Sequence, residues 1–169
     1  MERVEGAGLV GTSVHLLIQL LAERGGPAPA VADVIGEGRA FVGHGRSPSA
    51  RQALRVAVIT LTCVYVRQFW PLGGRLIASE LIVGDAALDL LWLLADGRLQ
   101  AHELKTGMFA GPAHEPTVMQ ARRQAEQASA LLGASFSGVR VALLRWPDSS
   151  FHVDPAGTLT ASPGSLPPC

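Results

Sequence analysis

Cysteine and lysine are both scarce in this sequence of 169 residues. The two cysteines, Cys63 and Cys169, are too few for a disulfide framework or a four-cysteine metal cluster. Of the 14 cationic residues, 13 are arginine and Lys105 is the one lysine. A GC-rich codon bias is one simple cause of the many arginines. The remaining lysine is of interest because lysine is a compact point charge whose pKa can shift, whereas arginine is neither.

Net charge and long apolar runs are also missing. The formal net charge is +0, so there is no overall basic field, and any contact with nucleic acid must come from a local arginine patch. The longest apolar stretch, residues 53–66, contains Arg55 and is too short to cross a bilayer. Residues 1–5 lack the pattern of a signal peptide. We therefore expect a cytoplasmic protein without a membrane segment.

The composition is that of a folded protein, with 48% hydrophobic and 17% charged residues. The length predicts a single domain over residues 1–160, followed by a loose Ser/Pro-rich tail over 161–169. Helices are expected at about 12–24, 48–70 and 116–132, and strands at 75–83, 87–95, 98–105 and 139–145, with a short pair at 151–153 and 158–160. This order, α-α-β-β-β-α-β, predicts an α/β layered domain.

Three details of this assignment depend on single features. Thr12 or Ser13 is the expected N-cap of the first helix, with Gly25 and Gly26 at its end. Residues 25–46, which are rich in Gly, Pro and Ala, are expected to form a connection with a short strand or turn at 40–42. The β-branched residues within the second helix also permit a strand there.

The residues that indicate chemistry lie on two neighbouring predicted strands. Glu103 and Lys105 are two positions apart in one strand, so their side chains point to the same face. Asp89 interrupts the apolar strand before it, where a carboxylate is costly to bury unless it is paired or metal-bound. Two carboxylates and an ammonium group form a hard-cation site that suits phosphodiester hydrolysis.

The turn between these strands decides whether such a site can form. A two-residue turn at Asp96-Gly97 pairs Asp89 with position 104 and places it on the face opposite Glu103. A three-residue loop, 95–97 or 96–98, pairs Asp89 with 103 or 105 instead. The site therefore requires the odd-numbered loop, in which Gly97 can take the left-handed conformation, or a bulge.

These residues resemble the PD-(D/E)XK nuclease superfamily, whose pattern is an acidic residue on one strand and Asp/Glu-x-Lys on the next. Lys105-Thr106-Gly107 is similar to the end of this strand in the RecB-like branch. Residues 11–15, Gly-Thr-Ser-Val-His, resemble the early Gly-Thr-x-x-His motif of that branch. Gln120 resembles the start of its Gln-x-x-x-Tyr helix motif, in which Gln124 stands here in place of the tyrosine.

The resemblance implies a restriction-endonuclease-like fold, with a central mixed β-sheet flanked by helices, and dependence on Mg²⁺ or Mn²⁺. It implies metal ligands at His15, Asp89, Glu103 and the carbonyl of Leu104, with Glu80 as a further candidate. We expect substrate contacts from Gln120, Gln124 and Arg123, although a solvated glutamine face and pairing of Arg123 with Glu126 are the alternatives. His102 and His114 are expected at the surface or on phosphate, and Trp92 and Trp146 in the core or at an edge.

The sequence thus predicts a metal-dependent deoxyribonuclease with Asp89, Glu103 and Lys105 at its centre. RNA as substrate is not excluded, and internal and end-directed cleavage are both open. Protein partners or a homo-oligomer are also compatible with the sequence. The alternative is a nuclease-like binding or assembly module with weak or lost catalysis, which is consistent with the zero net charge and with Gln124. A small-molecule enzyme with a carboxylate–metal site is a weaker third hypothesis.

Overall fold

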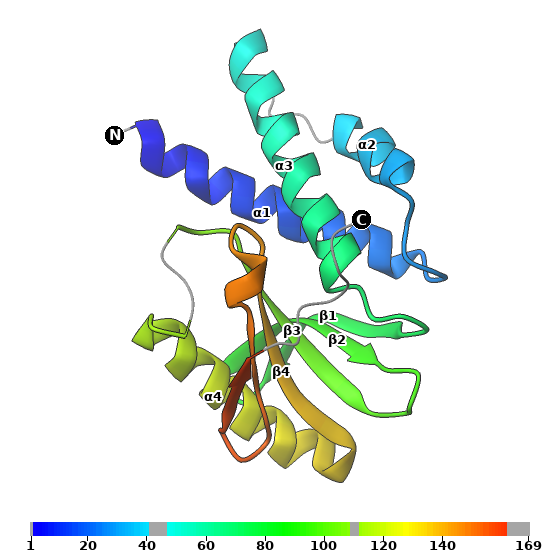
Figure 1. The fold of residues 1–169 in the computed structure, drawn as a ribbon, viewed down its shortest axis with the longest axis vertical. Helices are drawn as coiled ribbons and strands as arrows, with labels where there is room; N and C mark the ends of the chain where they lie inside the picture. The colour runs from blue at the N-terminus through cyan, green and yellow to red at the C-terminus, as the bar shows by residue number, and fades with distance from the viewer. Residues whose placement is uncertain (1, 41–46, 109–111, 162–169) are drawn as a thin grey trace.

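Within residues 2–40, 47–108 and 112–161, which the computed structural model describes, the chain forms four α-helices and one six-stranded sheet (Figure 1). The helices are α1 (Glu2–Glu23), α2 (Val31–Ala40), α3 (Pro48–Gln68) and α4 (Glu115–Leu132), with short 3₁₀ turns at Gly133–Ser135 and Pro147–Ser149. The strands are β1 (Arg75–Val83), β2 (Ala86–Leu93), β3 (Leu99–Lys105), β4 (Phe136–Leu143), β5 (Phe151–Val153) and β6 (Leu159–Ala161).

The sheet is mixed, and its strands follow the order of the chain from β1 to β6. All neighbouring strands are antiparallel except β3 and β4, which are parallel. A parallel pair needs a crossover connection, and α4 supplies it. The expected α/β fold with a central mixed sheet and flanking helices is therefore confirmed.

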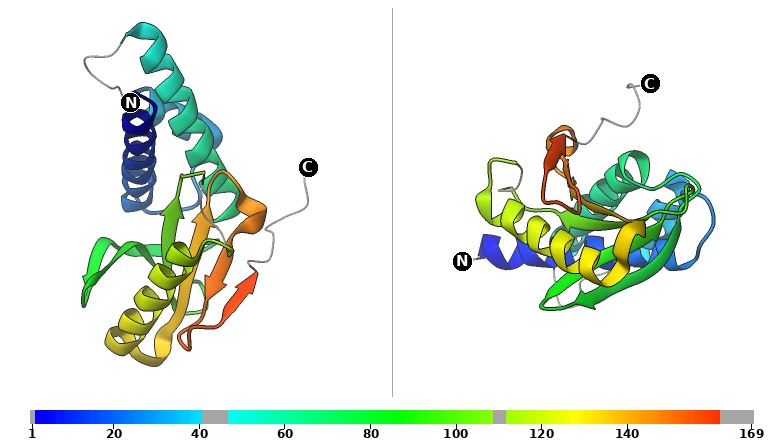
Figure 2. Two further views of the ribbon diagram at one scale, coloured as in Figure 1. Left: turned by 90° about the vertical axis from the view of Figure 1, so that its left-hand side faces the viewer. Right: turned by 90° about the horizontal axis from the view of Figure 1, so that it is seen from below.

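Apolar side chains form a separate core on each face of the sheet. On one face α1 and α3 cover the sheet, through buried residues such as Val14, Tyr65, Leu90, Trp92 and Leu104. On the other face α4 packs through its alanines against residues that include Leu88, Leu91, Ala101, Val139 and Val141. Figure 2 shows α1 and α3 together at one end of the molecule, with α4 running along the sheet apart from them.

The first helix is longer than the sequence predicted. It begins at Glu2, so Thr12 and Ser13 lie inside it and do not cap it. The Thr12 hydroxyl donates to the Gly8 carbonyl one turn earlier, which is a common helix-interior role for threonine. Where the helix ends, Gly25 and Gly26 adopt positive φ angles, as expected for a stop signal.

Helix α2 replaces the connection expected over residues 25–46. Gly36 and Gly38 lower its intrinsic helix propensity, so the composition pointed away from a helix. Gly38 is buried, and a Cβ there would collide with the Ile59 side chain of α3. Tertiary packing against α3 therefore outweighs propensity. Of the strand or turn expected at 40–42, residue 40 ends α2 and the others lie outside the described residues.

The remaining elements agree closely with the prediction. The segment that could have been a strand is the helix α3, which Ser47 caps by accepting a hydrogen bond from the backbone N–H of Ala50. Strand β1 has the predicted bounds, and the short β5–β6 pair forms as expected. Strand β4 begins at Phe136, earlier than predicted. None of the helices in the described residues has the length and apolar character needed to cross a bilayer.

Candidate metal and catalytic centre

The β2–β3 hairpin closes with the odd-numbered loop that the site requires. Residues 95–97 form the loop, and Gly97 adopts a φ of +84°. The register of the ladder, continued by one pair, brings Asp89 opposite Glu103. In place of a regular ladder bond, the Asp89 carboxylate accepts a hydrogen bond of 2.7 Å from the backbone N–H of Leu104. Asp89 is thereby fixed to the end of β3.

On the α4 face, Glu103 is the centre of a polar network. One carboxylate oxygen, Oε1, accepts from Lys105 Nζ at 2.7 Å and from Gln120 Nε2 at 2.8 Å. The other, Oε2, accepts from Gln124 Nε2 at 2.6 Å. Gln120 Oε1 also accepts from Lys105 Nζ at 2.8 Å. Because Glu103 is only 5% exposed, these donors compensate the loss of water around a buried carboxylate.

A third carboxylate, Glu80 of β1, lies across the ladder from Asp89. The β1–β2 pairs form on both sides of this position but not at it. Glu80 has a φ of +50°, the one positive φ among the described residues other than glycine. Such a conformation costs on the order of 1–3 kcal/mol, and like charges directly opposite in a sheet repel. Strain and repulsion thus coincide at one point of the sheet.

His15 approaches this point from α1. Its Nε2 lies 3.2 Å from the carbonyl oxygen of Leu104 and its Nδ1 lies 3.7 Å from Asp89 Oδ1. Burial lowers the pKa of His15, although the nearby charge of Glu103 opposes this, so the neutral ring is favoured. A carbonyl only accepts, so Nε2 carries the proton and Nδ1 is a bare lone pair. That lone pair faces a carboxylate, an arrangement that a cation would stabilise.

One ligand atom from each of His15, Glu80 and Asp89 lies within 4.8 Å of the other two. Burial and the neighbouring charge of Glu103 raise the pKa of Asp89 to about 8. Glu103 is therefore electrostatically part of the same centre, but its oxygens accept from Lys105 and from the glutamines of α4 rather than facing this group. Among the described residues, Glu80 thus joins His15 and Asp89 more directly than Glu103 does.

The two sequence motifs that carried the resemblance meet in space. Gly11 of α1 passes so close to Thr106 that a Cβ would lie 2.9 Å from its hydroxyl oxygen. Glycine at this position allows α1 to cross the end of β3, and His15 follows one turn later on the same helix. Arg145, after β4, donates to the carbonyl of Thr106 at 2.7 Å and holds this strand end in place.

The three expected substrate-binding residues have structural partners. Gln124 is buried and donates to Glu103 and to the backbone carbonyl of Ala87, so the solvated-face alternative is wrong for it. Gln120 is exposed and bonds to the catalytic candidates. Arg123 pairs with Asp85 and not with Glu126. Spacing placed the glutamines on one helix face, but it could not show that this face covers Glu103.

The expectation of a surface position is wrong for His102. It is fully buried on the α1/α3 face, where Tyr65 donates to its Nδ1 at 2.8 Å and Gln100 accepts from its Nε2 at 3.0 Å. His114 is half-buried at the start of α4, 2.7 Å from the Thr117 hydroxyl. Trp92 lies in the core and Trp146 is 52% exposed, so the two tryptophans occupy a core and an edge position as expected.

Comparison of the chain with protein-family models, with curated proteins and with solved structures found no match.

Proposed function

We propose that this protein is a divalent-cation-dependent nuclease that hydrolyses DNA phosphodiester bonds. The observation that carries the proposal is the convergence of His15, Glu80 and Asp89 within 4.8 Å at the strand end that also carries Lys105, the only lysine of the chain. Strained backbone, opposed carboxylates and a buried charge gathered at one place are typical of functional sites.

The donor set fits Mg²⁺ or Mn²⁺. Two carboxylates, a neutral imidazole and the Leu104 carbonyl beside it offer oxygen and nitrogen ligands without sulfur, which suits hard cations. A bound cation supplies Lewis acidity toward the phosphate and lowers the pKa of a bound water. The cation would also relieve the repulsion between Glu80 and Asp89, which lie opposite each other in the sheet.

Lys105 is the group that would assist the reaction at the phosphate. Its ammonium lies 2.7 Å from Glu103 and 2.8 Å from Gln120, so the side chain is held at a defined point beside the carboxylates. From there it can orient the attacking water and donate to the charge that develops on the phosphate oxygens. Gln120 and Gln124 keep Glu103 in place and thereby position the lysine.

A binding or assembly module is the second candidate, and one observation favours it. Lys105 is already paired, and both oxygens of Glu103 are hydrogen-bonded within the protein, so this half of the centre is satisfied without substrate. A module of this kind does not require Mg²⁺ or Mn²⁺. Calorimetric titration of the protein with each metal therefore separates the two candidates.

The test of the proposed activity is a nuclease assay with and without Mn²⁺ or Mg²⁺. Linear and circular DNA distinguish end-directed from internal cleavage, and single-stranded and double-stranded DNA show which form is cut. An RNA strand tests whether the substrate must contain deoxyribose. The Lys105→Ala variant, purified in the same way, is the control for contaminating nucleases. We expect metal-dependent cleavage by the wild type alone. Equal cleavage by both proteins, or none by either, contradicts the proposal.

A further inference from the structure

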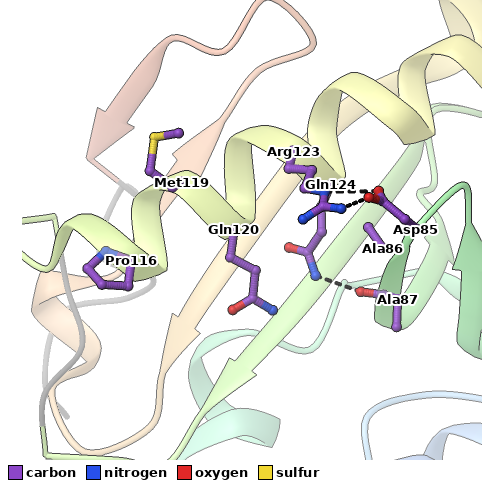
Figure 3. Close-up of a pocket in the computed structure, with 8 residues that line it drawn as sticks. All are labelled: Asp85, Ala86, Ala87, Pro116, Met119, Gln120, Arg123 and Gln124. Atoms are coloured by element: carbon purple, nitrogen blue, oxygen red, sulfur yellow. Dashed lines mark hydrogen bonds and ion pairs between the residues drawn. The ribbon is translucent and has the colours of Figure 1, made fainter.

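A groove of about 460 Å³ lies between α4 and the turn that joins β1 to β2 (Figure 3). It is lined by Asp85, Ala86, Ala87, Pro116, Met119, Gln120, Arg123 and Gln124. Pockets that hold small ligands have volumes of about 300–1,000 Å³. Gln120 and Gln124 line the groove and also hydrogen-bond to Glu103, so the groove adjoins the candidate catalytic centre.

The walls of the groove are apolar and amide in character. Ala86, Ala87, Pro116 and Met119 supply apolar surface, and the Met119 side chain is 55% exposed. The two charged residues of the lining, Asp85 and Arg123, are paired with each other. A phosphate would therefore find no unpaired cation among the lining residues. A flat, weakly polar ring fits these walls better than a charged group does.

One buried polar atom in this lining has no partner. Gln124 Nε2 donates to two acceptors, the Ala87 carbonyl and Glu103 Oε2, each at 2.6 Å, and this fixes the orientation of the amide. Its oxygen, Oε1, is buried and accepts no hydrogen bond within the described residues. In Figure 3 the oxygen points away from Ala87, toward the side of Gln120. An unpaired buried acceptor is costly, and a ligand N–H would satisfy it.

We propose that this groove is a subsite for one unpaired base of the substrate strand, an inference that rests on the proposed nuclease function. Met119 and the alanines would contact the ring, and Gln124 Oε1 would accept from a base N–H. Every base has such a donor, so we expect little sequence preference. A base that enters the groove must leave its stack and its pairing partner, so the strand is single-stranded next to the cleaved phosphate.

The experiment measures binding without cleavage. The Lys105→Ala variant, or the wild type with a chelator should that variant not fold, is titrated with a short fluorescent single strand. A second titration uses a strand of equal length and charge that lacks all its bases, and a third uses a duplex. We expect the normal strand to bind about tenfold more tightly than the abasic strand and the duplex, the range given by one hydrogen bond that satisfies a buried acceptor.

Two exposed residues of α4 make a matched pair of variants. Met119→Ala removes one wall of the groove and should reduce the advantage of the normal strand over the abasic one. Leu131→Ala removes a side chain of the same helix that is 64% exposed and does not line the groove, and it should leave the advantage unchanged. Such a cycle isolates the contact between base and groove from general charge effects.

The outcomes separate this inference from the nuclease proposal. Equal binding of normal and abasic strands, or an advantage that Met119→Ala leaves unchanged, overturns the base subsite. If the wild type still cleaves DNA in that case, the nuclease proposal remains. A base-dependent advantage that Met119→Ala reduces supports the subsite, and the absence of cleavage with Mn²⁺ would then count against catalysis only.

Discussion

His102 and Glu103 are neighbours in β3 whose side chains enter opposite faces of the sheet, and both are buried. The His102 network is closed. Trp92 donates to the Tyr65 hydroxyl, which donates to His102, which donates to Gln100. Burial lowers the pKa of His102 well below its usual value, in agreement with a neutral ring. The polar groups of Trp92, Tyr65 and His102 are therefore all paired, and none is left for a ligand.

The centre around Glu103 and Asp89 is not closed in this way. Glu103 has its donors, but Asp89 and Glu80 oppose each other, and the lone pair of His15 faces Asp89. Gln124 Oε1 has no partner among the described residues. The comparison shows that polar burial alone does not indicate function. A mismatch of acceptors that a cation or a ligand would resolve is the more informative sign.

Lys105→Ala should have the largest effect. That effect should be confined to the centre around Glu103 and Asp89, which we call the open centre. Under the proposed nuclease function, we expect turnover to fall on the order of 10²–10³-fold, as for the loss of one positioned donor, while Mn²⁺ affinity changes little. The melting temperature should fall as well, because the buried Glu103 carboxylate loses its charged donor. Lys105→Arg should also be poor, because the planar guanidinium cannot occupy the same point. Kinetics with calorimetry measure both effects. A Lys105→Ala protein that cleaves at the wild-type rate would contradict the proposed catalytic role of Lys105.

Tyr65→Phe should break the closed network and leave the open centre intact. Removing the hydroxyl leaves the Trp92 N–H and His102 Nδ1 without their partner, at a cost of about 1–3 kcal/mol for each buried group. The melting temperature should fall by about 2–4 °C for each kcal/mol lost. Mn²⁺ affinity should not change. Trp146→Phe, at an exposed aromatic, is the control and should be neutral.

Asp89→Asn tests whether the open centre is destabilised when it holds no cation. The folded-state pKa of Asp89 is raised to about 8, so protons bind the folded protein more tightly than the unfolded chain. The stability of the wild type with chelator should therefore decrease from about pH 4 to pH 8. The variant should lack this decrease and melt higher than the wild type at pH 8.

Added Mn²⁺ should reverse the order of the two proteins, since it binds only the folded wild type tightly. The measurement is a series of thermal melts at several pH values, each with Mn²⁺ and with chelator. A variant that melts below the wild type at pH 8 in the presence of chelator would contradict the argument.

Much of the candidate site could be predicted from the sequence, because the residues that indicate it lie close together along the chain. Alternation of side chains in β3 places Glu103 and Lys105 on one face, and only an odd-numbered loop between β2 and β3 brings Asp89 beside them. Helix α2 and the burial of His102 could not be predicted, because each depends on a partner far along the chain, Ile59 for Gly38 and Tyr65 for His102. Contacts between residues far apart in the chain determine both the formation of α2 and the burial of His102, and a single sequence does not reveal such contacts.

Gln127→Ala should have the smallest effect. It tests the border of the open centre, where α4 holds the β1–β2 turn. Gln127 Oε1 accepts from the backbone N–H groups of Asp85 and Ala86 at 3.2 and 3.0 Å, and its amide nitrogen donates to the Asp85 carboxylate. The turn is partly exposed, so water replaces some of these bonds. We expect a loss of about 0.5–1.5 kcal/mol in the free energy of unfolding. Because the turn forms one wall of the groove, single-strand binding should weaken as well, with Mn²⁺ affinity unchanged.

Arg98→Ala, which breaks the exposed Asp96–Arg98 pair, is the control and should change neither quantity. Denaturant unfolding and strand titration measure the two effects. A Gln127→Ala protein with wild-type stability and binding would show that the turn holds its position without α4.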